Sequence, residues 1–322
     1  MIFTEPMLEN YSQPLSATED AHCKNSIRMI RDALKPLGFA DDNRDVVALY
    51  PDTFAYSIAM RSITGSRRIK IFIQGSYANN TCVRTESDVD IAVVEEDIYT
   101  SEFRDGVTRE QYGIAAFTYP PQKFKNVVQD ALTRMFGPNA VERKDKSVKV
   151  YGNSYRKDAD TVPCYRHRNY QNDYRFDIDN YIGGIIIYPD SGGFIINYPE
   201  QHIYYGKQKN IATNGYYKKM VRIMKKMRYL MEDEKIKAAN GVSSFLLESL
   251  LWNVPDDWYL DYCSIYRKVF AFYMLISYLK NNKMNYRLFK EANGIKPLCP
   301  DTVAYTNLCS FIDELSIYYK YE

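Results

Sequence analysis

Residues 71–94 constrain the fold more than any other stretch, because they contain two apolar runs whose facing ends are polar. The first run stops at Gly75 and Ser76, and the second follows Asp88 and Asp90. Short apolar runs bounded by turn residues predict buried strands. Residues two apart in a strand point to the same face, so both carboxylates share one face at the start of the second strand. Two like charges this close repel, and burying either one costs free energy.

Two aspartates at this spacing most often lie on an exposed strand edge, and the chain has three such pairs. They are Asp88/Asp90, Asp158/Asp160 and Asp177/Asp179. The first pair differs from the others because it opens a strongly apolar strand and follows a glycine-serine break. A divalent cation would remove its charge conflict, and Mg²⁺ prefers oxygen ligands, often one or two carboxylates together with substrate phosphates.

The break at Gly75 and Ser76 has the composition of a phosphate-binding turn. Glycine lets the backbone approach a ligand closely, and the following amides and the serine hydroxyl can hold phosphate oxygens. A phosphate cradle at the end of one strand, with a metal-binding pair at the start of the next, predicts phosphoryl-transfer chemistry.

The motif GSYANNT…SDVDIAVV resembles the G-S…D-x-D signature of the DNA polymerase beta nucleotidyltransferase superfamily. The resemblance implies a third acidic residue on a neighbouring strand. In RKDADTVPCYRH, the residues from Asp160 to Pro163 look like the Asp-x-Val-Pro element of that family, so Asp160 is the expected third carboxylate. Asp158 lies on the same strand face and is the alternative. We expect Asp177 and Asp179, in polar sequence, to be at the surface.

A two-faced helix is predicted within KQKNIATNGYYKKMVRIMKKMRYLMEDE. Its expected core face consists of Met220, Ile223, Met224, Met227, Leu230 and Met231. On a different face, Lys218, Arg222 and Lys225 recur at helical spacing with no acidic partner on the helix before Glu232. A solvated basic face is one interpretation. The other interpretation is that these three basic residues bind a triphosphate, whose roughly four negative charges make it a natural counterion.

This helix and the following GVSSFLLESLLW resemble the C-terminal lobe of cGAS/DncV-like nucleotidyltransferases, called CD-NTases, of the bacterial antiphage (CBASS) type. The resemblance implies catalytic and metal-binding roles for Asp88, Asp90 and Asp160. It implies nucleotide binding by Gly75, Ser76, Arg222, Lys225, Ser244 and Phe245. Phe245 stands where the animal enzyme has a tyrosine, which keeps base stacking but loses a hydroxyl. Ser243 and Ser244 could also simply cap a helix.

The expected fold is α+β and bilobal, as in polymerase-beta-like nucleotidyltransferases. A mixed-sheet catalytic core with a long N-terminal helix would occupy residues 1–200, and a helical C-terminal lobe residues 201–322. Sequence patterns predict helices at about 18–36, 51–64, 123–136, 214–237, 243–253, 257–280 and 302–319. They predict strands at 68–74 and 88–94, and hairpins at 147–151 with 155–164 and at 182–188 with 194–197.

The overall composition excludes several classes of protein. The 42 basic and 40 acidic residues give a net charge of +2, without the basic excess of a protein that coats nucleic acid. The six scattered cysteines and three histidines have no zinc-site spacing, so direct activation by double-stranded DNA through a zinc insertion is not expected. We expect a cytoplasmic protein without a signal peptide or membrane span, and a monomer.

The resemblance implies a two-Mg²⁺ nucleotidyl transfer, in which Mn²⁺ can substitute, on NTP substrates. A ribose hydroxyl attacks the α-phosphate of a second nucleotide, and a second attack closes a cyclic di- or trinucleotide that activates a downstream effector protein. Two alternatives stay open. One is a transferase with a linear product, such as 2′–5′ oligoadenylate or tailed RNA, and the other is an inactive nucleotide-sensing module. The bases, the linkage and the activating signal are not readable from this sequence.

Overall fold

The computed structural model describes residues 1–42, 47–49, 54–83, 88–115 and 120–322. Two compact units divide the chain. The sheet unit contains residues 16–78 and 88–200, and the helical unit contains residues 1–15, 79–87 and 201–322. The division at residue 200 stays a prediction about domains. The short segments 1–15 and 79–87 nevertheless pack with the helical unit.

Within the described residues, ten strands of the sheet unit form one mixed sheet, ordered β11-β10-β9-β6-β5-β4-β2, with β3 beside β4, β8 beside β9 and β7 beside β8. β6 and β9 pair in parallel, while their other neighbours are antiparallel. The strand bounds are β2 Phe39–Asp41, β3 Val47–Ala48, β4 Tyr56–Ser62, β5 Arg68–Ile73, β6 Val89–Glu102, β7 Val141–Arg143, β8 Val148–Val150, β9 Ala159–Asn169, β10 Ile182–Ile187 and β11 Ile195–Asn197. Both predicted hairpins are confirmed, as β8–β9 and β10–β11.

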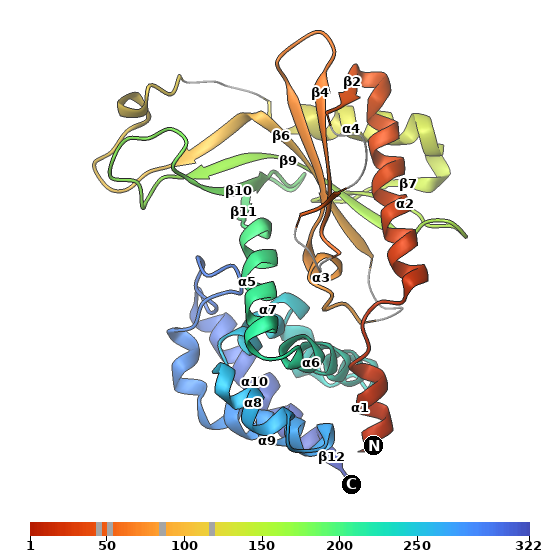
Figure 1. The fold of residues 1–322 in the computed structure, drawn as a ribbon, viewed down its shortest axis with the longest axis vertical. Coiled ribbons are helices and arrows are strands. Elements are labelled where there is room, and N and C mark those ends of the chain that lie inside the picture. The colour runs from red at the N-terminus through yellow and green to blue at the C-terminus, as the bar shows by residue number, and fades with distance from the viewer. Residues whose placement is uncertain (43–46, 50–53, 84–87, 116–119) are drawn as a thin grey trace. The chain divides into compact units, whose positions relative to one another are not determined.

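Two long helices cover one face of this sheet (Figure 1). They are α2, Ala17–Leu34, and α4, Pro121–Phe136, and both confirm predicted helices. α2 begins at a capping box in which Ser16 and Glu19 satisfy each other's backbone amides. α2 contacts β4 and β5, α4 contacts β8 and β9, and the two helices contact each other. The short elements of this unit are η1 Lys35–Leu37, α3 Gly75–Ala78, η2 Arg109–Tyr112 and η3 Pro138–Ala140.

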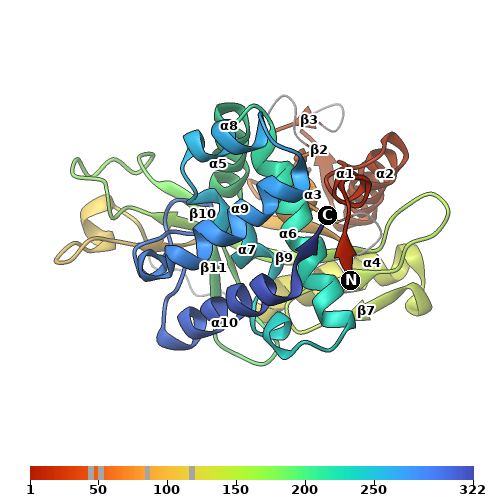
Figure 2. The same ribbon diagram turned by 90° about the horizontal axis from the view of Figure 1, so that it is seen from below.

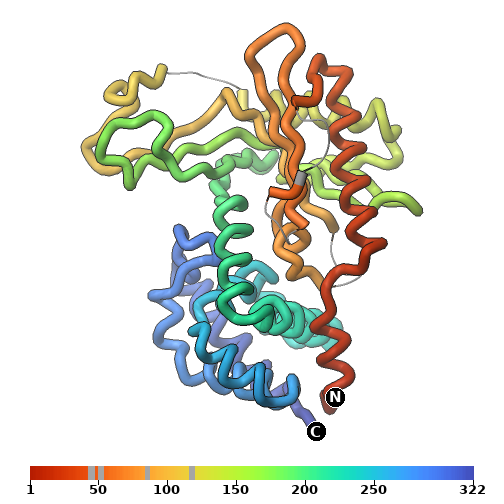
Figure 3. The backbone as a smooth tube through the Cα atoms, in the orientation of Figure 1, coloured from red at the N-terminus to blue at the C-terminus, as the bar shows by residue number. Residues whose placement is uncertain are grey.

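The helix predicted at residues 51–64 is wrong. Residues 50–53 lie outside the described residues, but Tyr56–Ser62 form β4, an antiparallel partner of β5, and Figure 3 shows the two running side by side. Ser57, Ile58 and Met60 are buried in this strand. Pairing with β5 provides backbone hydrogen bonds and burial that outweigh the weak local preference for helix.

The helical unit is built from seven α-helices among its described residues (Figure 2). They are α1 Glu5–Tyr11, α5 Pro199–Ala212, α6 Tyr216–Asp233, α7 Ser244–Trp252, α8 Asp256–Cys263, α9 Lys268–Asn281 and α10 Thr302–Tyr318. The single-turn helices η4 Lys237–Gly241 and η5 Lys283–Arg287 connect them, and β1 Ile2–Phe3 pairs in parallel with β12 Lys320–Tyr321. The helix predicted at 257–280 is two helices, since the chain leaves helical structure between α8 and α9.

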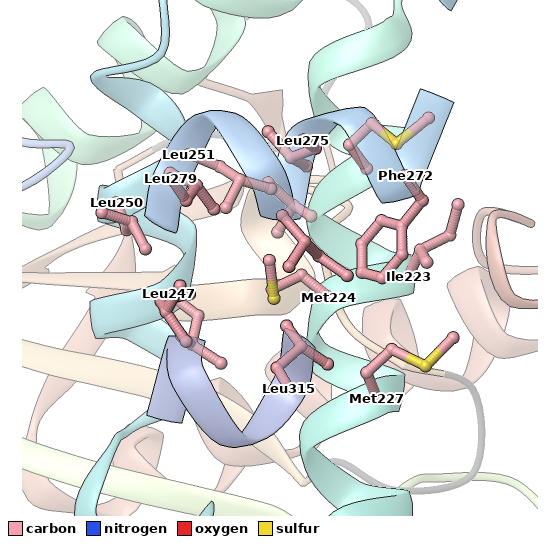
Figure 4. Close-up of a cluster of buried hydrophobic side chains, with 14 of the residues drawn as sticks. Ile223, Met224, Met227, Leu247, Leu250, Leu251, Phe272, Leu275, Leu279 and Leu315 are labelled. Atoms are coloured by element: carbon pink, nitrogen blue, oxygen red, sulfur yellow. The ribbon is translucent and has the colours of Figure 1, made fainter. Parts of the chain in front are cut away.

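The core of the helical unit confirms the predicted apolar face of α6. Met220, Met224, Met227 and Met231 are at most 1% exposed, whereas Leu230 is only partly buried. In Figure 4, residues of α6 meet leucines of α7 and α9 and a leucine of α10. None of the helices among the described residues is both long enough and apolar enough to cross a membrane.

Candidate active site

The parallel pairing of β6 and β9 brings two predicted site residues together. Asp90 and Asp160 are direct partners in the register of the two strands. Strand alternation places them on the sheet face that also carries Ala92 and Val162, and neighbouring strands are about 4.8 Å apart. Asp88 precedes Asp90 by two residues and shares that face by the same alternation. The neighbouring strand that the resemblance required is therefore present.

The carboxylate of Asp90 lies in an unfavourable electrostatic environment. Loss of hydration, followed by the nearby carboxylates of Asp160 and Asp88, raises the pKa of Asp90 to about 7. No described residue offsets this by donating a hydrogen bond to Asp90. Burial also raises the pKa of Asp160, although a hydrogen bond from Ser147 Oγ to its Oδ1, 3.1 Å, opposes the shift. Carboxylates that repel one another in a poorly hydrated site are suited to binding a cation.

A lysine from β8 neutralises the outer part of this acidic group. Lys149 Nζ lies 2.6 Å from Asp88 Oδ2 and 3.1 Å from Asp158 Oδ2. Asp158 also accepts the backbone N–H of Gly152 at 2.6 Å. Burial alone would raise the pKa of Asp158, but these two donors lower it. Asp158 therefore has its own partners, while Asp160 stands beside Asp90.

The predicted carboxylates are neighbours without forming a closed coordination shell. Among the residues that the structure describes, no three His, Cys, Asp or Glu side chains already form a group able to hold a metal ion. Asp88 is instead paired with the ammonium group of Lys149. The oxygen-only donor set fits Mg²⁺ or Mn²⁺, provided that Asp88 leaves Lys149.

Gly75 is required at the end of β5 for two reasons. Its φ is +68°, in the left-handed region that other residues rarely adopt. A Cβ at this position would also lie 2.7 Å from Asp90 Oδ2. Gly75 and the half-buried Ser76 begin α3, the four-residue helix that follows β5. The predicted phosphate-binding turn thus lies against Asp90.

On α6, Arg222 and Lys225 are occupied by partners within the helical unit. Arg222 donates hydrogen bonds to the carbonyls of Ser12, 2.7 Å, and Asn80, 2.5 Å. Lys225 Nζ lies 2.5 Å from Glu248 Oε2 and is 2% exposed. α6 itself has no acidic residue before Glu232, as the sequence shows, and the partner of Lys225 comes from α7. A role for either residue in binding phosphate stays a prediction.

Glu248 is the centre of a buried polar network that sequence patterns missed. Its carboxylate accepts from Lys225, from Thr81 Oγ1 at 2.6 Å and pairs with His202 Nε2 at 2.8 Å. Burial alone would raise the pKa of Glu248, but Lys225 and His202 hold it well below its ordinary value. A lone glutamate within the apolar SFLLESLLW was the available signal, because a carboxylate in such a helix needs a buried partner.

The serine pair at the start of α7 has two different roles. Ser243 is the cap, and its Oγ accepts the N–H of Leu246 at 3.0 Å. Ser244 is not needed for capping, and its Oγ lies 3.5 Å from Arg228 Nη1. Arg228 was missed by sequence reasoning, although it continues the basic spacing of α6 three residues after Lys225.

The predicted stacking residue Phe245 lies beside a cavity of about 390 Å³ that Leu246, Glu291 and Leu298 also line. Its ring packs edge to face with His202, with centroids 4.9 Å apart. An aromatic ring beside a cavity of this size can stack on a planar group such as a base.

The third aspartate pair is at the surface, as predicted. Asp177 and Asp179 are both exposed, and Asp177 Oδ1 accepts the backbone N–H of Asp179 at 2.9 Å. The two residues form a local turn without a strand face. They provide a matched control for the pair on β6.

Known proteins resemble the whole of this chain. A family model for the cGAS/DncV-like nucleotidyltransferase C-terminal helical domain matches residues 204–320. "Cyclic GMP-AMP synthase CdnE03" from Staphylococcus schleiferi is 43% identical over 321 residues, which cover 100% of this chain and 98% of that protein. "Cyclic dipyrimidine nucleotide synthase CdnE" from Cecembia lonarensis is 33% identical over 296 residues, 92% of this chain and 90% of that one. The structure of Elizabethkingia meningoseptica CdnE cyclic dinucleotide synthase with GTP and Apcpp superposes with a TM-score of 0.73 and 30% identity, over 98% of both chains.

Proposed function

The chain belongs to the cGAS/DncV-like nucleotidyltransferase family, and from that premise we propose that it joins nucleoside triphosphates into a cyclic di- or trinucleotide. The relatives named above are cyclic nucleotide synthases, and they differ in the bases that they join. The observation that supports a catalytic protein is the direct register of Asp90 with Asp160, next to Gly75 and Ser76. The mutual repulsion of the carboxylates of Asp88, Asp90 and Asp160 does not help to stabilise the fold, and such arrangements are typical of reaction sites.

We assign Asp88, Asp90 and Asp160 as the ligands of two Mg²⁺ ions. The ions would supply Lewis-acid chemistry, lowering the pKa of the attacking hydroxyl and neutralising charge on the leaving pyrophosphate. Asp160 is assigned to the side of the attacking hydroxyl. Lys149 holds Asp88 in an ion pair, which a bound metal ion would replace.

Nucleotide contacts are assigned to Gly75 and Ser76 for the phosphates, Ser244 for a further phosphate contact, and Phe245 for base stacking. Their positions support these roles, since the glycine turn lies against Asp90 and Phe245 lies beside a cavity. Arg222 and Lys225 are bound by internal partners. We infer that these contacts support the helical unit, and a phosphate contact by either residue stays a prediction.

In each proposed transfer, a ribose hydroxyl oxygen forms a bond to the α-phosphorus of a second nucleotide. The bond between that phosphorus and the bridging oxygen of the β-phosphate breaks, pyrophosphate leaves, and the hydroxyl proton passes to solvent. A second transfer of the same kind within the linear product closes the ring. In the antiphage role that the family resemblance implies, the product would activate a separate effector protein.

The test is the double variant Asp88→Asn with Asp90→Asn, assayed for pyrophosphate release from Mg²⁺ and a mixture of four NTPs. We expect a loss of more than about 10³-fold, because the charge that binds metal is removed. The control is Asp177→Asn with Asp179→Asn, the exposed pair of the same spacing. Normal turnover in the first variant would end the proposal. Mass spectrometry after phosphatase treatment separates a cyclic product from a linear one, since a cyclic product has no terminal phosphate to lose.

A further inference from the structure

The helical unit contains a basic cavity of about 460 Å³ that the proposed reaction does not use. Its described lining includes Lys218, Lys219, Arg222 and Lys268, together with the carboxylate of Glu9. Its lining includes none of the aspartates assigned to metal, nor the glycine turn, Ser244 or Phe245. An excess of cations around a concave space is the usual composition of an anion site.

Lys218 is the feature of this cavity that most requires explanation. Its side chain is buried, with 6% of the residue exposed, and within the described parts of the chain it has neither an ion pair nor a side-chain hydrogen bond. Burial lowers the pKa of Lys218 to about 8. Glu248 opposes this shift, and Arg222 and Lys207 add to it to a smaller extent. Lysine is rarely buried without a partner, because an ammonium group loses its hydration there.

The other groups in the lining do not neutralise Lys218. Glu9 is bound to Lys268, with Oε2 and Nζ 2.7 Å apart. Arg222 donates hydrogen bonds to the carbonyl oxygens of Ser12 and Asn80. Lys219 is partly exposed, 5.2 Å from the ring centroid of Tyr216. Among the lining residues that the structure describes, four basic side chains face one carboxylate.

The start of α6 adds to the positive potential of the cavity, but its backbone N–H groups are not free to bind an anion. Gly215 precedes the helix and lines the cavity. The N–H of Tyr217 already donates to Thr213 Oγ1, and that of Lys218 donates to Asn210 Oδ1. The positive end of the helix dipole still favours an anion there. A bound anion would consequently be held by the ammonium groups.

We propose that this cavity binds a small phosphoanhydride anion, either inorganic pyrophosphate or the phosphates of a nucleotide. Such an anion would give Lys218 its missing partner and match the excess of cations with compact negative charge. A cavity of this size accepts a small molecule, whereas a nucleic acid duplex would require an extended basic surface. The site is additional to the one proposed for catalysis.

The test is calorimetric titration and thermal unfolding of the full chain with pyrophosphate, in the presence of a metal chelator. The chelator removes pyrophosphate binding that depends on metal at the aspartates. We expect saturable binding that raises the Tm. Lys218→Met should weaken it at least tenfold while leaving the unliganded Tm equal or higher, because an unpaired charge is removed from a buried position. Lys237→Met, at an exposed lysine outside the lining, is the matched control.

Two further variants keep the proposal testable if Lys218→Met does not fold. Lys219→Glu places a carboxylate at the cavity and should also abolish binding. The Asp88→Asn, Asp90→Asn variant should bind pyrophosphate as the unaltered protein does, whatever the fate of its catalysis. Equal binding by Lys218→Met, Lys219→Glu and the unaltered protein overturns the proposal. The proposal is also overturned if the protein binds a 20-base-pair RNA through Lys218 but does not bind pyrophosphate. Parallel titration with a non-hydrolysable ATP analogue decides between the two sources of the anion.

Discussion

Two poorly hydrated carboxylates in this protein have opposite electrostatic environments. Glu248, in the helical unit, is 1% exposed and is surrounded by Lys225, His202 and Thr81, and Lys225 and His202 lower its pKa. Asp90, in the sheet unit, is half-buried, and loss of hydration followed by the carboxylates of Asp160 and Asp88 raises its pKa to about 7. A paired buried carboxylate supports the fold, whereas an unpaired one keeps a cost that only a ligand can offset. We infer that Glu248 is structural and Asp90 functional.

The largest effect on stability is expected for Glu248→Gln. The change leaves the buried Lys225 charged and without a counterion, so the free energy of unfolding should fall by about 3–5 kcal/mol. Urea unfolding followed by circular dichroism measures it. The matched control is Glu291→Gln, a second glutamate of the helical unit whose carboxylate accepts from Asn293 and has no cation in contact. A loss below about 1 kcal/mol in Glu248→Gln would place Glu248 outside the stabilising core.

The pH dependence of stability provides a second test of Glu248. Because its folded-state pKa lies below the ordinary value of 4.5, its contribution is complete above pH 4.5 and is lost as the pH falls below that value. The stability difference between the unaltered protein and Glu248→Gln should therefore shrink by up to about 1.4 kcal/mol per pH unit between pH 4.5 and 3. Unfolding curves at half-unit steps measure it. A difference that is constant over this range would contradict the buried ion pair.

Asp90→Asn should shift stability in the opposite direction to Glu248→Gln. In a metal chelator at pH 8 the substitution removes a charge that repels Asp88 and Asp160, so the free energy of unfolding should rise by about 1–2 kcal/mol. Unfolding in urea measures this change, and Asp177→Asn, at the exposed turn, is the control. A clear destabilisation by Asp90→Asn would show that its carboxylate has a structural partner after all.

Local patterns predicted most of the fold, and they failed where long-range pairing decides the outcome. The apolar periodicity of α2, α4 and α6 reports burial on one helix face, which the sequence contains directly. Residues 56–62 form a strand only because β5 lies beside them, and nothing local encodes that neighbour. The break between α8 and α9 was also missed, since no proline or glycine marks it.

The candidate site was predictable where one motif lies on one strand. The paired aspartates, the glycine turn and the neighbouring Asp160 each have a local signature. Lys149 has none, because its importance depends on Asp88, 61 positions away. Glu248 and Arg228 had weaker local signals, but their partners Lys225 and Ser244 lie 23 and 16 positions away, on a different element. Lys225 shows the consequence, since its helix alone presented it as an unpaired cation.

The smallest effect is expected for a substitution of Lys149. Lys149 pairs with Asp88 and Asp158 and so neutralises only part of the acidic group in the sheet unit, whereas the carboxylate of Glu248 is fully paired. In the proposed mechanism Lys149 would compete with Mg²⁺ for Asp88. Lys149→Met should therefore lower the Mg²⁺ concentration for half-maximal pyrophosphate release by about two- to fivefold, a change below about 1 kcal/mol. Mg²⁺ titration of the steady-state rate measures it, with Lys146→Met, an exposed lysine of the same segment, as the control. If Lys149 instead positions Asp88 for catalysis, the maximal rate will fall and the Mg²⁺ concentration for half-maximal pyrophosphate release will not decrease. That result would make the ion pair part of the working site and not a substitute for metal.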